Sequence, residues 1–326
     1  MSAPAANVEL VCPLCGSAAP KTFVRPYGDY RVLDCPDCGS GFSDPFRNPG
    51  PEYYEHNADL YSIVIETRPD PTSFEYREGL ALLRRELPRG ARVLDIGCGA
   101  GGFLHSAKAA GFSIVGLDFN PARAAALRER GFDVFNGDLP EFVRSGPAPF
   151  DAITIFEVIE HLDNPVQWLA QVKSLLKPGG LFIVGTPNRN RTFDPFQGPG
   201  MEQIDNPPHH LTRWSADSLS GFLSRQGFEV LESRALGVPR LLLCLIVRNT
   251  LRFGLAVKAL DTDQVRHAAA SPERAGPRRG LVLFLVAVKE AVINAAVTAT
   301  YPLFLVAYRL FGWQGVALFA AARRPR

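Results

Sequence analysis

The sequence predicts an α/β protein built on a doubly wound, mostly parallel sheet. Three observations predict this fold. An apolar run from Ala91 to Ile96 ends in a loop with glycine at alternate positions, and a helical pattern follows it. Short apolar segments then alternate with longer segments of helical periodicity, as in sheets that are covered by helices on both faces. Lys177-Pro178-Gly179-Gly180 supplies a clear helix stop between two such segments.

The elements follow one another in regular order along the chain. We expect helices near residues 74–87, 102–110, 121–130, 164–176 and 215–227. We expect strands near residues 91–96, 112–117, 132–136, 151–156, 181–186 and 229–234. A further short apolar run, Val316–Ala322, lies close to the chain end, after a long segment that this alternation does not explain. The predicted domains are residues 1–43, residues 44–238 as connector and core, residues 239–312 as insertion, and residues 313–326 as the last strand.

The glycine loop indicates a ligand that carries a nucleoside. Gly97, Gly99 and Gly101 stand between the first strand and its helix, where a ligand can approach bare backbone at a helix N-terminus. Asp118 ends the second strand, and a carboxylate there can accept hydrogen bonds from both ribose hydroxyls. Asp95 lies just before the glycines, where it would repel a pyrophosphate but favour an ammonium or sulfonium group.

The ordered motifs VLDIGCGAG, GLDFNP, NGDLPEF, FDAITIFEVIEHLDNP and LLKPGGLFIVGTPN resemble those of class I S-adenosylmethionine-dependent methyltransferases. The resemblance runs from about Ser73 to Ser233 and implies the seven-stranded fold of that class. It implies that Val316–Ala322 is the seventh, antiparallel strand, and that residues 239–312 are an insertion between strands six and seven. It also implies S-adenosylmethionine as cofactor and a set of contact residues. The residues implied to contact the methionine part of the cofactor are Asp95, Gly97, Gly99, Gly101, Phe156 and Glu157. Asp118 is implied to hold the ribose, whereas Asp138 and the Leu139 backbone are implied to face the adenine.

Four cysteines near the N-terminus predict a metal site. Cys12 and Cys15 form one C-x2-C pair, Cys35 and Cys38 form another, and a glycine follows each pair. This spacing suits a closed, tetrahedral, structural zinc site of the zinc-ribbon type. Two disulfides, iron–sulfur ligation and a ribbon that has lost its metal are the alternatives.

Two clusters are candidates for acid–base chemistry. Glu157, Glu160 and His161 follow the fourth strand at a spacing that places them on one face of a helix. EVIEHL resembles the ubiquinone-biosynthesis O-methyltransferases, in which a similar set is associated with a divalent metal, so a second metal site there is implied. His209 and His210 lie on a loop stiffened by two prolines, and one of them is the leading candidate for the base. Alternatively, these histidines only pack or hold the loop.

Charge is distributed unevenly along the chain. Residues 237–326 contain thirteen Lys and Arg against four Asp and Glu, a net charge of +9, so the preceding residues carry −7 within an overall charge of +2. This tail is also strongly apolar, which favours an anionic membrane surface over nucleic acid. We expect a basic amphipathic helix at 239–260 and an apolar hairpin at 281–308 that is buried or half inserted in the membrane. Alternatively, these helices pack on each other or form a dimer interface. Because residues 1–11 do not resemble a signal peptide, the prediction is a cytoplasmic protein attached peripherally to the membrane.

The leading function predicted from the sequence is methyl transfer to a small or lipid-linked acceptor, such as a surface-glycan sugar or an isoprenoid quinone. The zinc ribbon followed by a tyrosine-containing connector resembles bacterial methyltransferases of surface-glycan pathways. An RNA methyltransferase is the first alternative, because one ribosomal family also begins with a zinc ribbon, but the acidic charge before Gly237 argues against it. A non-catalytic S-adenosylmethionine-binding scaffold is the second alternative.

Overall fold

The computed structural model describes residues 7–50, 53, 74–192, 205–237, 243, 244, 247 and 277–326. The expected connector tyrosines Tyr54 and Tyr61, and almost all of the expected helix at 239–260, lie outside these residues. The chain divides into two compact units. One unit comprises Met1–Leu236 with Val316–Arg326, and the other comprises Gly237–Gly315.

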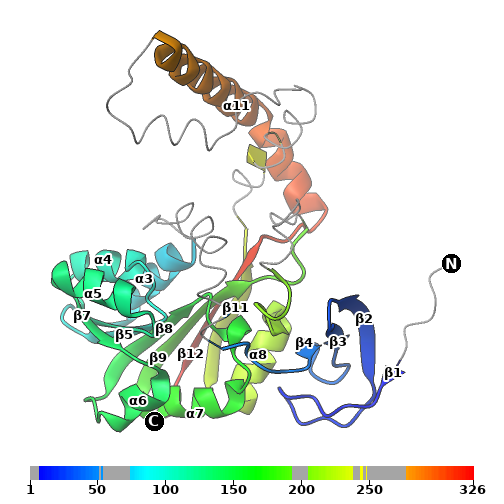
Figure 1. Ribbon diagram of the computed structural model, residues 1–326, viewed down its shortest axis with the longest axis vertical. Coiled ribbons are helices and arrows are strands. Elements are labelled where there is room, and N and C mark those ends of the chain that lie inside the picture. The colour runs from blue at the N-terminus through cyan, green and yellow to red at the C-terminus, as the bar shows by residue number, and fades with distance from the viewer. Residues whose placement is uncertain are drawn as a thin grey trace. The chain divides into compact units, whose positions relative to one another are not determined.

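The first unit contains a seven-stranded sheet in the order β11-β12-β9-β8-β5-β6-β7 (Figure 1). Its strands are β5 (Arg92–Ile96), β6 (Ser113–Asp118), β7 (Asp133–Asn136), β8 (Phe150–Phe156), β9 (Leu176–Pro187), β11 (Glu229–Leu236) and β12 (Ala317–Arg323). β12 runs antiparallel to both of its neighbours, whereas β5 to β9 pair in parallel. The predicted fold class and the late seventh strand are therefore confirmed.

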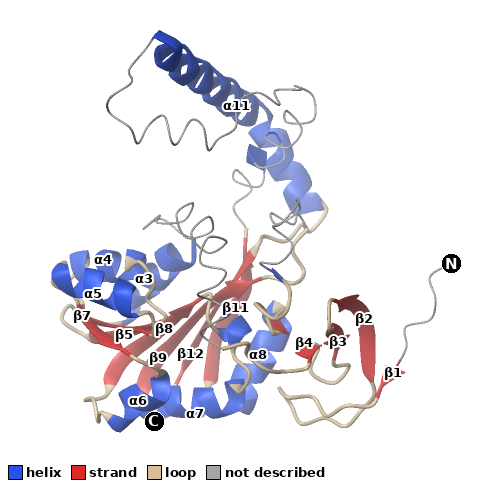
Figure 2. Ribbon diagram, viewed as in Figure 1, coloured by secondary structure: helices blue, strands red, loops and turns tan. Residues whose placement is uncertain are grey.

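Helices cover both faces of this sheet (Figures 1 and 2). One face carries α3 (Phe74–Glu86), α4 (Gly102–Ala109) and α5 (Pro121–Glu129), and the other carries α6 (Leu139–Arg144), α7 (Pro165–Leu175) and α8 (Ala216–Arg225). The side chains of a strand alternate between the faces, so Val93 packs in one apolar core and its neighbour Leu94 packs in the other. Both cores come from continuous apolar strands, as expected for a buried parallel sheet.

Two local features differ from the sequence-based expectations. Lys177-Pro178-Gly179-Gly180 does follow the end of α7, but these four residues belong to β9, which starts at Leu176. The strand is irregular there, with a register shift against β8. The short helix α6 was not expected. It forms because Asp138 and Glu141 make a capping box at its N-terminus.

The N-terminal residues form a second sheet in the same unit. Its order is β1-β2-β3-β4-β10, with strands β1 (Asn7–Val8), β2 (Lys21–Tyr27), β3 (Tyr30–Asp34), β4 (Gly41–Asp44) and β10 (Thr212–Arg213). β10 comes from the loop after β9, and it pairs with β4 through Thr212↔Phe42 and Arg213↔Gly41. Phe42 also shares one apolar core with Trp214 and Phe222. The sequence did not indicate that these two parts pack together.

The second unit contains α11 (Pro277–Leu310), a single helix of 34 residues. The expected hairpin at 281–308 is therefore wrong. Pro302 lies inside the helix, and the residues before it from 291 onward contain no other proline and no glycine. A lone proline kinks a helix, whereas a reversal needs turn residues. A 20-residue window, Ala291–Leu310, is long and apolar enough to cross a membrane by length and composition alone.

Candidate active site

The glycine loop after β5 adopts the conformation that the sequence predicts. Gly97, Gly99 and Gly101 have φ angles of 74°, 54° and 81°, in the left-handed region. A Cβ atom at Gly97 would lie 2.5 Å from Val158, and one at Gly101 would lie 2.5 Å from Leu127. At Gly99 a Cβ atom would meet nothing nearer than the Gly97 carbonyl oxygen, 3.9 Å away. The loop thus offers open space above Gly99, where a ligand can contact the backbone.

Asp118 is placed to recognise hydroxyl groups beside this loop. It ends β6, is buried, and accepts hydrogen bonds from the Gly99 amide at 2.8 Å and from the Asn120 amide at 2.9 Å, one on each oxygen. A carboxylate has about four acceptor positions, so both oxygens retain capacity for two ribose hydroxyls. These backbone bonds fix the orientation of the carboxylate before a ligand arrives.

Asp95 lies in β5, two residues before the glycine loop, and its side chain is buried. Thr154 on β8 donates a 2.7 Å hydrogen bond to it. Burial raises the pKa of Asp95 to about 7, with the Thr154 hydrogen bond opposing the shift and the charge of Asp118 adding to it. A buried carboxylate under a ligand loop is an energetic cost that a cationic ligand group would offset.

The adenine side of the predicted site is formed by the start of α6. Asp138 accepts a 2.8 Å hydrogen bond from the Glu141 amide, so it caps the helix, and the Leu139 side chain is buried. The capping role still leaves the second Asp138 oxygen as an acceptor. Phe119, 57% exposed, directly follows Asp118.

Phe156 is the last residue of β8, and Glu157 follows it. Phe156 packs 4.9 Å from the rings of both Tyr76 and Phe103, so Tyr76 on α3 closes this side of the site. Glu157 has a φ of 59°, which is rare for a residue with a side chain and clusters at functional sites. Its amide donates to the Gly185 carbonyl at 2.9 Å. The next residue, Val158, is the one that a side chain at Gly97 would strike.

Three histidines predicted from two separate motifs come together. His161 ends the short 3-10 helix η1 (Ile159–His161), and His209 and His210 lie on the loop before β10. The ring centroids are 4.4 to 4.8 Å apart. His161 Nδ1 lies 2.7 Å from the His209 carbonyl oxygen, which can only accept, so Nδ1 carries the proton and Nε2 keeps its lone pair.

His210 is oriented by Asp205, a residue that the sequence argument missed. His210 Nδ1 lies 3.1 Å from Asp205 Oδ1, and this contact leaves the lone pair on Nε2. His210 Nε2 faces Glu160 Oε1 at 4.0 Å. Glu160 accepts from Thr186 on its other oxygen, at 2.9 Å, while Oε1 has no hydrogen-bond partner among the described residues. A base held by a carboxylate is the arrangement that general-base catalysis needs.

Burial keeps these three histidines neutral at neutral pH. It lowers the pKa of His161 to about 3, assisted by His210, and it lowers the pKa of His209 and of His210. Burial raises the pKa of Glu160, and the charge of Glu157 adds to that shift. Burial also acts to raise the pKa of Asp205, but the His210 hydrogen bond and neighbouring arginines outweigh it and hold that pKa below its usual range.

The three histidines also form a candidate metal site. This site differs from the predicted one, which consisted of Glu157, Glu160 and His161. The ring nitrogens of the three histidines lie within 4.8 Å of one another, whereas neither Glu157 nor Glu160 belongs to this group. Neutral imidazoles are the usual nitrogen ligands of divalent transition metals. If this cluster takes a metal, the ligands come from both the EVIEHL motif and the proline-stiffened loop.

The start of the connector reaches the same cluster. The side-chain amide of Asn48 donates a 3.0 Å hydrogen bond to the His161 carbonyl oxygen. The backbone N–H of Asn48 donates a 3.0 Å hydrogen bond to the Asp163 carboxylate. Asn48 was not predicted, and nothing in its sequence neighbourhood indicates this contact.

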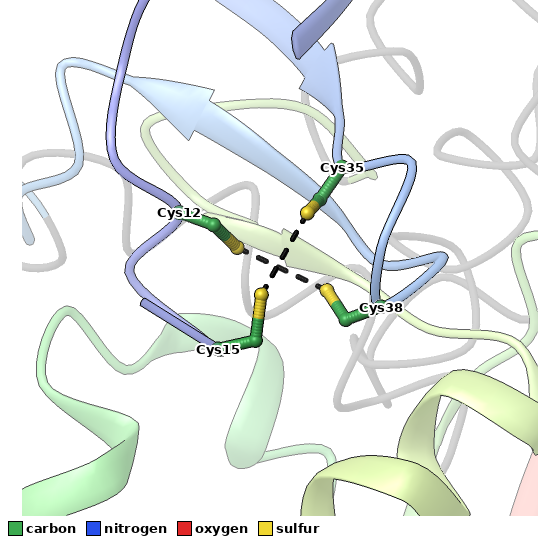
Figure 3. A group of neighbouring side chains, drawn as sticks. All are labelled: Cys12, Cys15, Cys35 and Cys38. Carbon is green, nitrogen blue, oxygen red and sulfur yellow. Dashed lines mark hydrogen bonds between the residues drawn. The ribbon is translucent and has the colours of Figure 1, made fainter. Parts of the chain in front are cut away.

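The four predicted cysteines form a separate cluster. Their side chains point toward a common centre (Figure 3). Cys12 Sγ lies 3.9 Å from Cys38 Sγ, and Cys15 Sγ lies 3.7 Å from Cys35 Sγ. Tetrahedral zinc with bonds of about 2.3 Å requires sulfur–sulfur edges of about 3.8 Å. All four cysteines are free thiols, so the geometry fits zinc and does not support two disulfides.

Residues 72–233 match the family model described as a methyltransferase domain. This part of the chain belongs to that family. A protein of Mycolicibacterium smegmatis named as an S-adenosylmethionine-dependent methyltransferase is 36% identical over 143 residues, which are 43% of this chain and 53% of the relative. A ubiquinone biosynthesis O-methyltransferase of Aromatoleum aromaticum is 35% identical over 121 residues, 35% of this chain and 52% of the relative. The chain therefore spans about half the length of these relatives.

Two solved structures show more distant likeness. A phosphoethanolamine N-methyltransferase 2 of Haemonchus contortus, in complex with S-adenosylmethionine, is 17% identical with a TM-score of 0.49, covering 79% of this chain and 54% of that one. An S-adenosylmethionine-dependent methyltransferase of Archaeoglobus fulgidus is 20% identical with a TM-score of 0.44, covering 76% of this chain and 94% of that one.

Proposed function

We propose that this chain transfers the methyl group of S-adenosylmethionine to a small or lipid-linked acceptor. The observation that carries this proposal is the pairing of the Gly99 backbone with the pre-oriented Asp118 carboxylate inside a methyltransferase-family domain. The ubiquinone O-methyltransferase relatives support an acceptor of the small, lipid type. When bound, S-adenosylmethionine supplies an activated methyl group on a sulfonium.

The residues of this chain would hold the cofactor from three sides. Asp95 would attract its ammonium group, Asp118 would accept from the ribose hydroxyls, and Asp138 and Leu139 would contact the adenine. Phe156 and Glu157 would close the site on the side of β8. Because the cofactor is already activated, the protein mainly has to position the reactants and exclude water.

An oxygen acceptor also has to lose a proton. We propose that His210 or His209 takes it, with Asp205 orienting His210 and His161 adjoining both rings. The low pKa that burial imposes on these rings keeps the lone pair available at neutral pH. A divalent metal at the three histidines is the alternative role for the same residues.

The second unit supports a peripheral attachment to the inner face of the cytoplasmic membrane. Leu236 at the end of β11 pairs with Ala317 at the start of β12, so the insertion leaves and returns at adjacent points. Its two ends must lie on one side of a membrane, which excludes a single crossing by α11. The helix also exposes Val292, Leu303 and Val306. We propose that this apolar face lies in the interface, together with the basic segment 239–260.

Vesicle flotation tests the attachment. Wild-type protein should float with vesicles that contain anionic lipid, and the variant Leu303→Glu/Val306→Glu should remain at the bottom of the gradient. Leu231→Glu, on the exposed side of β11, is the matched control and should float like wild type. Recovery of wild-type protein entirely in the vesicle-free fraction would end the membrane proposal.

A donor-consumption assay tests the methyltransferase proposal. Purified chain with radiolabelled S-adenosylmethionine should transfer label into a lipid or glycan extract and leave RNA unlabelled. Label in RNA would instead support the zinc-ribbon RNA methyltransferase. Binding of the cofactor without transfer to any extract would support a non-catalytic scaffold.

A further inference from the structure

Both ends of the insertion are attached at the same edge of the seven-stranded sheet. Leu236 is the last residue of β11, and it pairs with Ala317, the first residue of β12. Ala317 also pairs with Pro187, the last residue of β9. Because β9 ends there, this is the carboxyl edge of the parallel strands, where α/β proteins bind their ligands. The chain therefore leaves the core, and returns to it, at the edge that holds the proposed site.

The point of return is bonded to the segment that carries the candidate base. The backbone N–H of Asn188 donates a 2.9 Å hydrogen bond to the Val316 carbonyl oxygen. Asn188 also forms an isolated β-bridge with Trp214, and the N–H of Arg189 donates a 2.9 Å hydrogen bond to the Trp214 carbonyl oxygen. His210 precedes Trp214 by four residues. The root of the insertion thus contacts the same backbone that positions the histidine loop.

The end of α11 that is nearest to this edge along the chain is apolar and exposed. Leu303, Val306 and Leu310 are 76%, 56% and 76% exposed. At about 100° per residue, these three side chains lie within about 60° of one another. Phe311 is 70% exposed and stacks on Trp313, with ring centroids 5.7 Å apart. Tryptophan beside an exposed apolar surface is characteristic of the headgroup level of a membrane. In the proposed membrane attachment, this end of α11 would therefore lie at that level.

The chain between this end of α11 and the sheet is short. Trp313 precedes Ala317 by four residues. An extended chain spans at most about 3.6 Å per residue, so the two residues can be no more than about 14 Å apart, whatever direction the chain takes. The polar end of a membrane lipid lies at the headgroup level too, because its apolar chain stays among the acyl chains. A group carried on a lipid would thus lie within reach of the carboxyl edge.

We propose that the insertion presents the carboxyl edge of the sheet to the membrane surface, and that the methyl acceptor is carried on a lipid whose apolar chain stays in the bilayer. This inference rests on the proposed methyltransferase function and on the proposed attachment. The apolar carrier is what the acceptor class shares, whether its polar end is a sugar joined through phosphate or the ring of an isoprenoid quinone. A water-soluble acceptor would reach the same edge from solution and would not need the insertion beside it.

The arrangement has a kinetic consequence. An enzyme and an acceptor that are held on one surface meet at a high effective concentration without any additional contact between them. The rate of methyl transfer should therefore depend on the mole fraction of the acceptor in the vesicle, and on the length of the chain that joins the core to the insertion.

A variant that keeps the insertion but lengthens both of its connections tests the proposal. Flexible Gly-Ser segments of about twelve residues would be inserted between Leu236 and Gly237 and between Gly315 and Val316, at the boundaries of the two units. Each segment adds an average reach of about 17–21 Å, which exceeds the native limit of about 14 Å. The same segment inserted after Gly146, between α6 and β8, is the matched control, because a Cβ atom at Gly146 would meet nothing within 4 Å among the described residues.

The measurement compares two ways of presenting one lipid extract. Lipids of the source cells are mixed with phosphatidylcholine and phosphatidylglycerol and offered as vesicles or as detergent micelles, with radiolabelled S-adenosylmethionine. Wild type and the control should label the vesicles about tenfold or more faster than the lengthened variant, which should still float with them. All three proteins should label the micelles equally. Anion exchange of the labelled lipid then separates a phosphate-linked carrier, which is retained, from a quinone, which is not.

The outcomes separate this inference from the proposed function. Equal labelling of vesicles by wild type and the lengthened variant, or label confined to a water-soluble extract, would overturn the lipid carrier and leave methyl transfer intact. No label in any extract would remove the proposed function and this inference with it. If the lengthened variant loses cofactor affinity in calorimetry, Leu303→Glu/Val306→Glu replaces it. That variant should label vesicles about tenfold or more slowly than wild type, and a wild-type rate would overturn the proposal.

Discussion

The proposed cofactor half and the proposed acceptor half of this site are built in opposite ways. The cofactor half consists of β5, β6 and β7 with the loops at their carboxyl ends, and its residues lie at the end of a strand or in the loop that follows. The acceptor half consists of η1, residues 205–213, Asn48 and the zinc-ribbon sheet. Several of its contacts join residues more than a hundred positions apart, such as Arg189 with Asp34 and Asn48 with His161.

This difference has a structural cause. In the cofactor half, the parallel strands alone bring Gly99 and Asp118 within 2.8 Å, since neighbouring strands end at the same edge. In the acceptor half, the residues are brought together by the pairing of β10 with β4 and by an apolar core that the two sheets share. We therefore expect the acceptor half to depend on the zinc that the four cysteines are predicted to bind, and the cofactor half to tolerate its loss.

Removing one zinc ligand should separate the two halves most strongly. Cys35→Ser should lose the metal, about one zinc per chain in wild type, and should abolish turnover, because the ribbon strands support β10 and the histidine loop. Cofactor affinity should change much less. Metal analysis, turnover and calorimetry on one preparation measure all three.

Cys244→Ser is the control, since that thiol lies outside the cluster. It should keep metal, turnover and cofactor binding. Equal loss of cofactor binding and turnover in Cys35→Ser, or full turnover without metal, would contradict the division into halves.

Substituting the candidate base should affect only the acceptor half. His210→Ala or His209→Ala should lower kcat by about a hundredfold or more, because proton removal from the acceptor loses its base. S-adenosylmethionine affinity should stay within about twofold of wild type, since these rings lie outside the glycine loop. Steady-state kinetics and calorimetry measure the two quantities.

His161→Ala is the comparison. If both loop variants keep full activity and His161→Ala loses it, the base lies on η1. If all three lose activity together with a bound metal, the cluster is a metal site.

The pH dependence of cofactor affinity tests the role of Asp95 in the cofactor half. Asp95 has a folded-state pKa of about 7, well above its ordinary value near 3.8. The cofactor's ammonium favours the ionised carboxylate, so binding expels the proton, and affinity should fall as pH drops below 7, approaching about tenfold per pH unit. Asp95→Asn cannot titrate and should give a flatter profile between pH 5.5 and 7, by calorimetry in buffers of about that range. A slope in Asp95→Asn equal to wild type would assign the titration elsewhere.

Before ligand binding the same shift acts on stability with a definite sign. Between about pH 4 and pH 7 the native state binds more protons at Asp95 than the unfolded state does, so this residue lowers the free energy of unfolding as pH rises through that window. The buried histidines act in the opposite direction, because their pKa values are lowered and the unfolded state protonates first as pH falls.

The sequence predicts the features of the cofactor half better than those of the acceptor half. The strand order, the late strand β12 and the residues after β5 and β6 depend on local patterns, and the fold class was predicted from them. The contacts of Asn48 with His161 and of Arg189 with Asp34 depend on how distant parts of the chain pack together, which no periodicity encodes. The expected hairpin failed for a different reason, since it was inferred from the need for the insertion to leave and return on one side of a membrane, whereas local propensity favours one continuous helix, Pro277–Leu310.

The central claim is that the loop at Gly99 and the carboxylate of Asp118 bind S-adenosylmethionine. Calorimetry of the cofactor with wild type and with Asp118→Ala tests it most directly. Two hydrogen bonds to a charged carboxylate contribute about 1.5–3 kcal/mol each, so the variant should bind about tenfold or more weakly while keeping its fold. Wild type should bind one cofactor per chain. Equal affinity in the two folded proteins, or no binding to wild type, would contradict the account.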